Sequence, residues 1–140
     1  MEQVYESGSD FEEKTLVYFP ENFNCSNDKN KLDNRSGKKG PEAESVVTGV
    51  VGDKTYAFIG LERIGGVMVY DITNPAKAAF VNYINTRDFS EKIAGDVSPE
   101  GLCFVEAFES FSGNAELIVA NEVSGTVAIY EMTAKQVEDT

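Results

Sequence analysis

A repeat within the chain constrains its fold more than any other feature. Identical residues recur 60 positions apart, among them Glu62 and Glu122, Tyr70 and Tyr130, and Thr73 and Thr133. The pair Pro41-Glu42 recurs as Pro99-Glu100 at a slightly shorter separation, which indicates a small insertion between the matched segments. Because the same order of residues occurs twice, we expect two similar structural units in succession.

Each copy has the residue pattern of antiparallel strands. The predicted strands cover residues 46–51, 55–61, 67–72, 79–84, 102–107, 115–120 and 126–132. They are rich in β-branched and aromatic side chains, which are typical of strands. Three dipeptides separate neighbouring strands and supply the positive φ of tight hairpin turns. These dipeptides are Gly52-Asp53, Gly65-Gly66 and Ser124-Gly125.

A repeat of four antiparallel strands with long loops predicts a β-propeller blade. The middle strands are apolar on both faces, which favours sheets stacked between neighbours. A two-layer β-sandwich is the alternative. We therefore expect an all-β fold made of two four-stranded antiparallel propeller-blade repeats, a fragment of a larger β-propeller. A short N-terminal helix and a long loop precede the repeats.

The chain divides into three predicted parts. Residues 1–40 form the helix and a polar loop, which is either an excursion between blades or a mobile tail. Residues 41–97 form the first blade repeat, and residues 98–140 form the second, which is incomplete because the chain ends before its fourth strand. A propeller usually closes with four to eight blades. We therefore expect the partners to be the remaining blades of a parent protein or a second copy of this chain.

The charge and composition exclude several classes of function. The net charge is -12, from 24 acidic and 12 basic residues, so we expect no nucleic-acid partner. There is no histidine, which excludes Ser-His-Asp and Cys-His catalytic groups and the usual zinc sites within this chain. No apolar run reaches the roughly 18 residues of a membrane helix, so we expect no membrane insertion.

The two cysteines, Cys25 and Cys103, do not make a disulfide framework. Cys25 lies in a polar loop. Cys103 lies in an apolar strand pattern, so we expect it to be a small buried side chain. A disulfide between them has no support in the sequence.

Four glutamates at the ends of predicted strands are the candidate metal ligands: Glu42, Glu62, Glu100 and Glu122. Blade symmetry is expected to relate Glu42 to Glu100 and Glu62 to Glu122, so that the carboxylates ring a central channel and bind Ca²⁺ through oxygen. In the alternative interpretation each glutamate accepts backbone hydrogen bonds where a strand begins or ends. Arg63 and Arg87 are predicted to pair with neighbouring acidic residues, or to clamp a phosphate or carboxylate.

Several long motifs occur in a fixed order along the chain: residues 40–44, 56–73, 83–89, 99–102 and 119–127. Together they resemble the C-terminal β-propeller region of the choice-of-anchor I family. These are exported bacterial proteins often labelled alkaline phosphatase, with animal relatives called mesenchyme-specific cell surface glycoproteins. The resemblance covers about residues 9–131 and supplies no catalytic residue. In this family an acidic stretch precedes Gly40, but here the stretch contains Lys38 and Lys39.

The resemblance implies an extracellular, periplasmic or cell-surface parent, whose signal peptide is not in this chain. We expect a non-catalytic β-propeller segment that acts as a scaffold or binding surface, and not a complete enzyme on its own. One alternative is a part of a calcium-dependent phosphoesterase with carboxylates lining its channel. Another is an adhesive module that associates through its exposed sheet edges.

Overall fold

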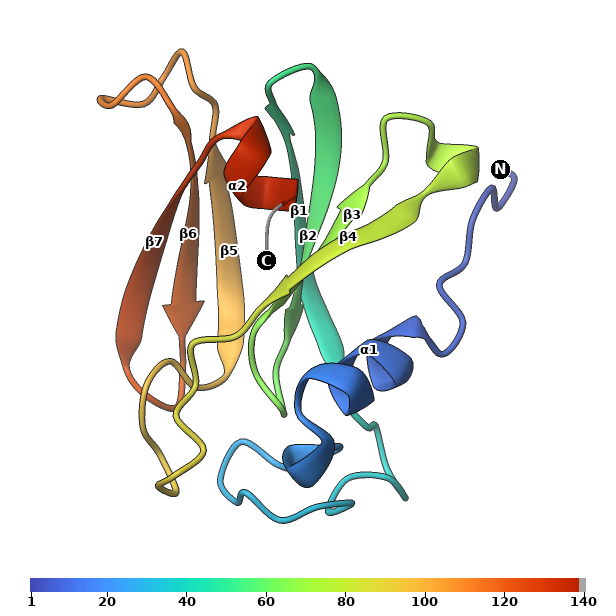
Figure 1. Ribbon diagram of the computed structural model, residues 1–140, viewed down its shortest axis with the longest axis vertical. Helices are drawn as coiled ribbons and strands as arrows, with labels where there is room; N and C mark the ends of the chain where they lie inside the picture. Colours follow the sequence, from blue (N-terminus) through green and yellow to red (C-terminus); the bar gives the residue numbers. More distant parts are fainter. Residues whose placement is uncertain (139–140) are drawn as a thin grey trace.

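The computed structural model describes residues 1–138 and is mostly β, with two antiparallel sheets (Figure 1). Its elements are α1 (Asp10–Tyr18), η1 (Pro20–Asn22), β1 (Ala43–Val51), β2 (Lys54–Leu61), β3 (Val67–Asp71), η2 (Pro75–Lys77), β4 (Ala79–Ile84), β5 (Pro99–Val105), β6 (Ala115–Asn121), β7 (Thr126–Met132) and α2 (Ala134–Glu138). The first sheet has the order β1-β2-β3-β4, and the second has the order β5-β6-β7. The predicted antiparallel strands and the N-terminal helix are thus confirmed.

The second and third strands of the two sheets correspond at the predicted separation. In the first sheet Ala57 of β2 pairs with Tyr70 of β3. In the second sheet the residues 60 positions later, Leu117 of β6 and Tyr130 of β7, form the same pair. The hairpins β2–β3 and β6–β7 are therefore equivalent residue by residue.

The residues that precede the first strand of each sheet have the same backbone role. Glu42 and Ser98 both have a positive φ, of 58° and 69°. The carbonyl of Glu42 accepts a hydrogen bond from the backbone N–H of Glu62 at 2.9 Å. The carbonyl of Ser98 accepts the equivalent bond from Glu122 at 2.8 Å, so Glu42 corresponds to Ser98.

A β-bulge opens the first strand of each sheet, and each bulge contains a glutamate. These residues are Glu44 in β1 and Glu100 in β5, which are therefore equivalent. The predicted equivalence of Glu42 with Glu100 is wrong. The error arises because the connection between β5 and β6 is longer than the Gly52-Asp53 turn between β1 and β2. The insertion lies in that connection, after the first strand of the second sheet.

Apolar side chains from both sheets fill the space between them. The Phe104 ring of β5 lies over Gly49 of β1 and stacks on Phe58 of β2, with ring centroids 5.5 Å apart. Strand β5 lies against β1 and β2, whereas α2 contacts both outer strands, β4 and β7, and fills the gap between them (Figure 1). The buried core residues are Val51, Tyr56, Phe58, Val67, Val69, Ala115, Leu117, Val119, Met132 and Val137.

The two sheets stack front to back. In β2, Phe58 packs in the core between the sheets, while Ile59 packs on the opposite side of the first sheet. In β6, Ile118 is the equivalent of Phe58 but lies on the outer side of the second sheet. Val119 is the equivalent of Ile59 but packs in the core between the sheets. Equivalent faces therefore point in the same direction in both sheets.

The helix α1 and the segment that follows it as far as Cys25 pack on the other side of the first sheet. Cys25 is fully buried there, in a second apolar cluster that includes Phe11 and Phe19. The Phe19 ring meets the Tyr83 ring of β4 edge to face, with centroids 5.9 Å apart. Among residues 1–138, no helix is both long and apolar enough to span a bilayer.

The predicted burial of Cys103 is wrong, and it is Cys25 that is buried. Cys25 is buried, although its loop is polar, because that loop covers the first sheet. Cys103 is exposed, because Leu102 and Phe104 on either side of it face the core and its own side chain lies on the uncovered side of β5. Both thiols are free.

We predict that Gly49→Ala lowers the free energy of unfolding by about 1–3 kcal/mol, as overpacking of a filled core does. A Cβ atom at Gly49 overlaps the Phe104 ring. Urea denaturation followed by circular dichroism measures the loss. The control is Gly37→Ala, because no atom lies within 4 Å of a Cβ at that position. An equal midpoint shift in both variants would contradict the packing described above.

Candidate functional site

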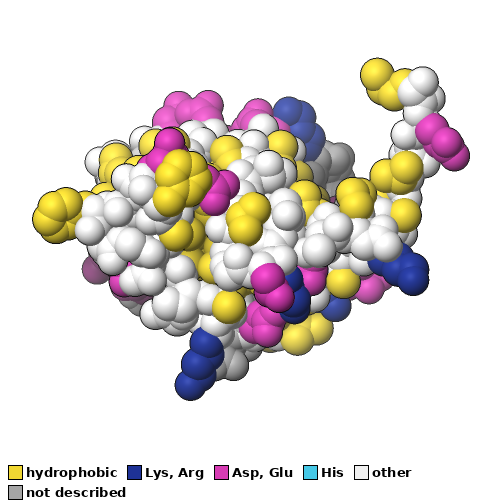
Figure 2. Space-filling model, turned by 90° about the horizontal axis from the view of Figure 1, so that it is seen from above, with side chains coloured by type: hydrophobic (Ala, Val, Ile, Leu, Met, Phe, Trp, Pro, Cys, Tyr) yellow, Lys and Arg dark blue, Asp and Glu magenta, His cyan; other side chains and the backbone are white. Residues whose placement is uncertain are grey.

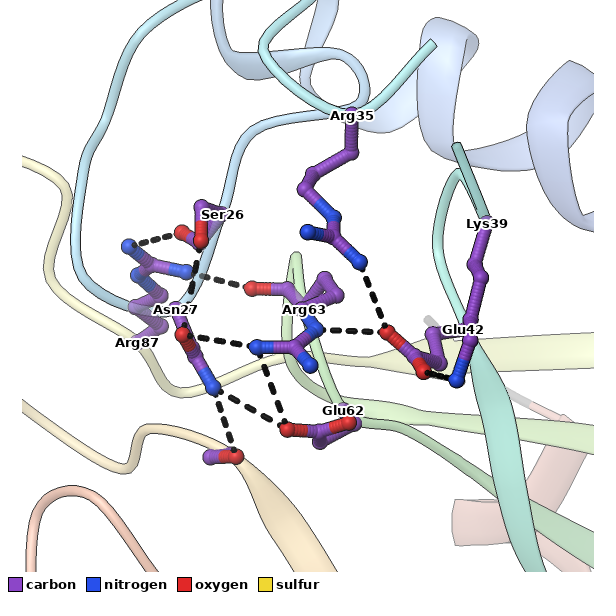
Figure 3. Close-up of polar contacts among 9 residues, drawn as sticks. Ser26, Asn27, Arg35, Lys39, Glu42, Glu62, Arg63 and Arg87 are labelled. Carbon is purple, nitrogen blue, oxygen red and sulfur yellow. Dashed lines mark hydrogen bonds and ion pairs between the residues drawn. The ribbon is translucent and has the colours of Figure 1, made fainter. Parts of the chain in front are cut away.

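Charged side chains from three loops meet at one end of the first sheet (Figure 3). Glu42 immediately precedes β1, and Glu62 and Arg63 immediately follow β2. Antiparallel pairing of β1 with β2 therefore brings these residues to one edge. The N-terminal loop adds Asn27, and the connection between β4 and β5 adds Arg87.

The Glu42 carboxylate is buried and binds three cationic side chains. Its Oε2 atom lies 2.5 Å from Nε of Arg63 and 3.3 Å from Nη2 of Arg35. Its Oε1 atom lies 2.5 Å from Nζ of Lys39. Burial alone would raise the pKa of Glu42, but the hydrogen bonds from Arg63 and Lys39 outweigh it and lower the pKa to about 2. Glu42 is therefore ionised and fully paired at neutral pH.

Glu62 is buried beside Glu42 and has the opposite shift. Its Oε1 atom accepts a hydrogen bond from Asn27 at 3.1 Å and lies 3.4 Å from Nη1 of Arg63. Burial raises the pKa of Glu62 to about 7, helped by its hydrogen bond with the Glu44 carboxyl group. Glu62 therefore keeps its proton to a higher pH than an ordinary glutamate does.

Asn27 links the N-terminal loop to both sheets. Its side-chain Nδ2 donates to Glu62 and, at 3.3 Å, to the hydroxyl of Ser98, which precedes β5. Its Oδ1 atom accepts a hydrogen bond from Arg63 at 3.2 Å. All its side-chain polar atoms therefore bind protein groups, as a structural hub requires.

Arg87 is buried and binds carbonyl oxygens. It donates to the backbone oxygens of Arg63 at 2.8 Å and Ser26 at 2.9 Å, and to Oδ1 of Asn30 at 2.8 Å. Its guanidinium also lies over the Phe89 ring, 4.8 Å from the centroid. Burial lowers the pKa of Arg87 from its usual value. The prediction of acidic partners is confirmed for Arg63 and wrong for Arg87, which forms no ion pair among residues 1–138.

Three carboxylates of this cluster lie close enough together to hold a cation. One oxygen each of Glu42, Glu44 and Glu62 lies within 4.8 Å of the others. Calcium requires six to eight oxygen ligands, and carboxylates are suitable donors. However, both oxygens of Glu42 already bind cationic side chains, and these carry three positive charges. These charges belong to Arg35, Lys39 and Arg63.

The four predicted metal ligands fall into two groups. Glu42 and Glu62 belong to the cluster at the first sheet. Glu100 and Glu122 are exposed at the equivalent end of the second sheet, where they line one open depression of about 520 Å³. Glu44 was not among the predicted ligands, and its equivalence to Glu100 becomes visible only once the β-bulges are aligned. Calcium binding by either group stays a prediction.

We predict that Glu62 makes the fold less stable as pH rises. Its pKa is about 7 in the folded state, against an ordinary value of 4.5. The folded state therefore binds the proton more tightly, so the stabilisation is complete below about pH 4.5 and is lost as pH rises through 7. Urea unfolding at pH 5 and pH 8 should show a loss on the order of 2 kcal/mol that Glu62→Gln removes. The matched control is Glu122→Gln, and an unchanged loss in Glu62→Gln would refute the assignment.

Comparison with known proteins identifies the family. A model of the choice-of-anchor I domain matches residues 1–75, more than half of the chain. Gigasin-3a from Magallana gigas is 26% identical over 147 aligned positions, which cover 94% of this chain and 52% of the relative. The chain thus spans about half the length of that curated relative. No solved structure matches it. The matched residues include α1 and β1 to β3, and the chain belongs to the choice-of-anchor I family.

Proposed function

We propose that this chain forms two adjacent blades of a β-propeller and acts as a non-catalytic scaffold or binding surface in an exported or surface protein. The observation that carries this proposal is the front-to-back stacking of equivalent sheets. Such an interface is heterologous, and repetition of a heterologous interface closes a ring when the rotation allows it. Family membership supports the surface role, since it points to an exported or surface protein.

The exposed apolar side chains on the outer face of the second sheet are evidence that a further sheet packs there. Val127 and Ile129 of β7 are 66% and 63% exposed, whereas their equivalents in β3, Val67 and Val69, are 3% and 1% exposed. The difference arises because Val67 and Val69 pack against the second sheet. The outer face of the second sheet therefore has the composition of a buried face.

The face of the first sheet that points away from the second sheet is evidence for a preceding sheet. Residues 1–40 pack against β2, β3 and β4 but leave Val46 of β1 exposed. The equivalent of Val46 in the second sheet is Leu102, which packs against the core between the sheets. A preceding sheet can therefore contact β1 at Val46 while α1 occupies the outer part of that interface. In the interface between the first and second sheets, α2 likewise occupies the outer part, between β4 and β7.

The polar cluster favours a structural role over catalysis. The carboxylate of Glu42 and the side chain of Asn27 bind protein groups with all of their polar atoms. The phosphoesterase alternative requires Glu42, Glu62, Glu100 and Glu122 to converge, and they lie in two groups. The adhesive alternative requires a second copy of this chain to cover the outer face of the second sheet, and it predicts dimers whose fraction rises with concentration.

Reactivity of Cys103 tests the propeller. In this chain alone we expect Ellman's reagent to modify Cys103 rapidly, and Cys25 only after unfolding. In a full-length protein that contains the next sheet, Cys103 should become as slow as Cys25, because that sheet covers β5. A Cys103→Ser variant identifies which thiol reacts. Rapid modification of Cys103 in the full-length protein would rule out a covering sheet.

Calcium titration calorimetry separates the scaffold from the phosphoesterase. We expect no micromolar binding to this chain, because cationic side chains already neutralise the Glu42 cluster. The comparison is between two double variants, Glu44→Gln/Glu62→Gln and Glu100→Gln/Glu122→Gln. Micromolar binding abolished by only one of them would make that pair a metal site and favour the phosphoesterase alternative.

A further inference from the structure

One connection of the second sheet has no counterpart in the first. Residues 106–114 join β5 to β6, whereas β1 and β2 are joined by the two residues Gly52 and Asp53. The longer connection, called here the β5–β6 loop, therefore contains residues that are not required to join the two strands. Figure 1 shows it extending beyond the ends of the strands.

The β5–β6 loop exposes two aromatic rings to solvent. Phe108 is 85% exposed, and Phe111 is fully exposed at 108%. Figure 2 views the end of the molecule where this loop lies and shows hydrophobic side chains projecting beside carboxylates. Single exposed apolar residues are common. Two phenylalanines within four positions of a segment that the sheet does not require indicate a contact surface.

The loop is ordered by its own hydrogen bonds. The backbone N–H of Ser110 donates to the carbonyl of Glu106 at 3.1 Å, and its hydroxyl donates to Glu116 at 2.9 Å. Asn114 donates to the carboxylate of Glu131 at 3.2 Å. These bonds restrain the backbone that carries Phe108 and Phe111, so the loop needs little rearrangement to present them to a partner. Such preorganisation lowers the entropy lost on binding.

The charge around the loop selects the chemistry of the partner. No lysine or arginine occurs between residues 93 and 134, so the whole second sheet and its loops carry only negative charge. The carboxylates of the loop and the adjoining strands are Glu106, Glu109, Glu116 and Glu131. Anionic lipids and nucleic acids are repelled by such a surface. A partner protein whose surface carries basic side chains is instead attracted to the negatively charged loop.

We infer that the β5–β6 loop docks into an apolar cleft of a protein partner whose rim carries lysine and arginine. Phe108 and Phe111 are the anchors, and aromatic anchors are typical of binding hot spots. Beside the loop lies an open hollow of about 250 Å³, lined by Val50, Met132 and Ala134, which can receive an apolar side chain of the partner. This interaction does not depend on the propeller proposed above.

The test uses model ligands of defined composition. One probe is a fluorescent amphipathic peptide of leucine and lysine, and the second has glutamate in place of lysine. The third is a vesicle of phosphatidylcholine. Fluorescence anisotropy and vesicle flotation compare the wild-type chain with Phe108→Ser/Phe111→Ser. The control is Leu16→Ser/Val17→Ser, which removes two exposed apolar side chains of α1. All these positions are exposed, so unchanged thermal midpoints are expected.

We expect the leucine-lysine peptide to bind, with affinity that falls as salt rises and drops about tenfold or more in Phe108→Ser/Phe111→Ser. The control variant should bind like the wild type, and the glutamate peptide should not bind. Equal binding of the wild type and Phe108→Ser/Phe111→Ser would overturn the inference, as would an equal loss in the control. Phenylalanine-dependent binding to the vesicles would also overturn it, since the anchors would then insert into lipid.

Discussion

The core between the sheets is held where β5 crosses β1 and β2, with the Phe104 ring over Gly49 and beside Phe58. A side chain at Gly49 would separate the strands at this point. The register of both sheets then determines which side chains face this core, because each strand alternates between the core and the opposite face. The burial of Val67 and the exposure of Val127 both follow from this single packing arrangement.

The polar cluster depends on the same arrangement. Ser98 immediately precedes the second sheet, and it reaches Asn27 only because β5 lies against the first sheet. Within the cluster, Glu42 and Glu62 differ in pKa although they are neighbours. Cationic partners stabilise the charge of Glu42, while burial and a neighbouring carboxyl group disfavour the charge of Glu62. The cluster joins three segments of chain and leaves few polar atoms for a ligand.

The sequence predicted the strands well, because the repeat and the hairpin turns are local signals. It did not predict that Glu44 corresponds to Glu100, because the longer β5–β6 loop changes the separation between equivalent residues on its two sides. It also predicted a buried Cys103, whose side chain is exposed. Alternation along a strand separates two faces but cannot tell which face another segment covers. Packing of residues 1–40 on the first sheet decides that question, and it is a long-range contact.

The helix α2 has a consequence for the geometry of any larger assembly. The sheets touch at β1 and β5 and are held apart at β4 and β7 by α2, so the pair is a wedge. In a ring of equal wedges, the angle of one wedge fixes how many fit around the axis. The five-residue helix α2, which separates the outer strands, would then set the angle between adjacent sheets and with it the symmetry of the ring.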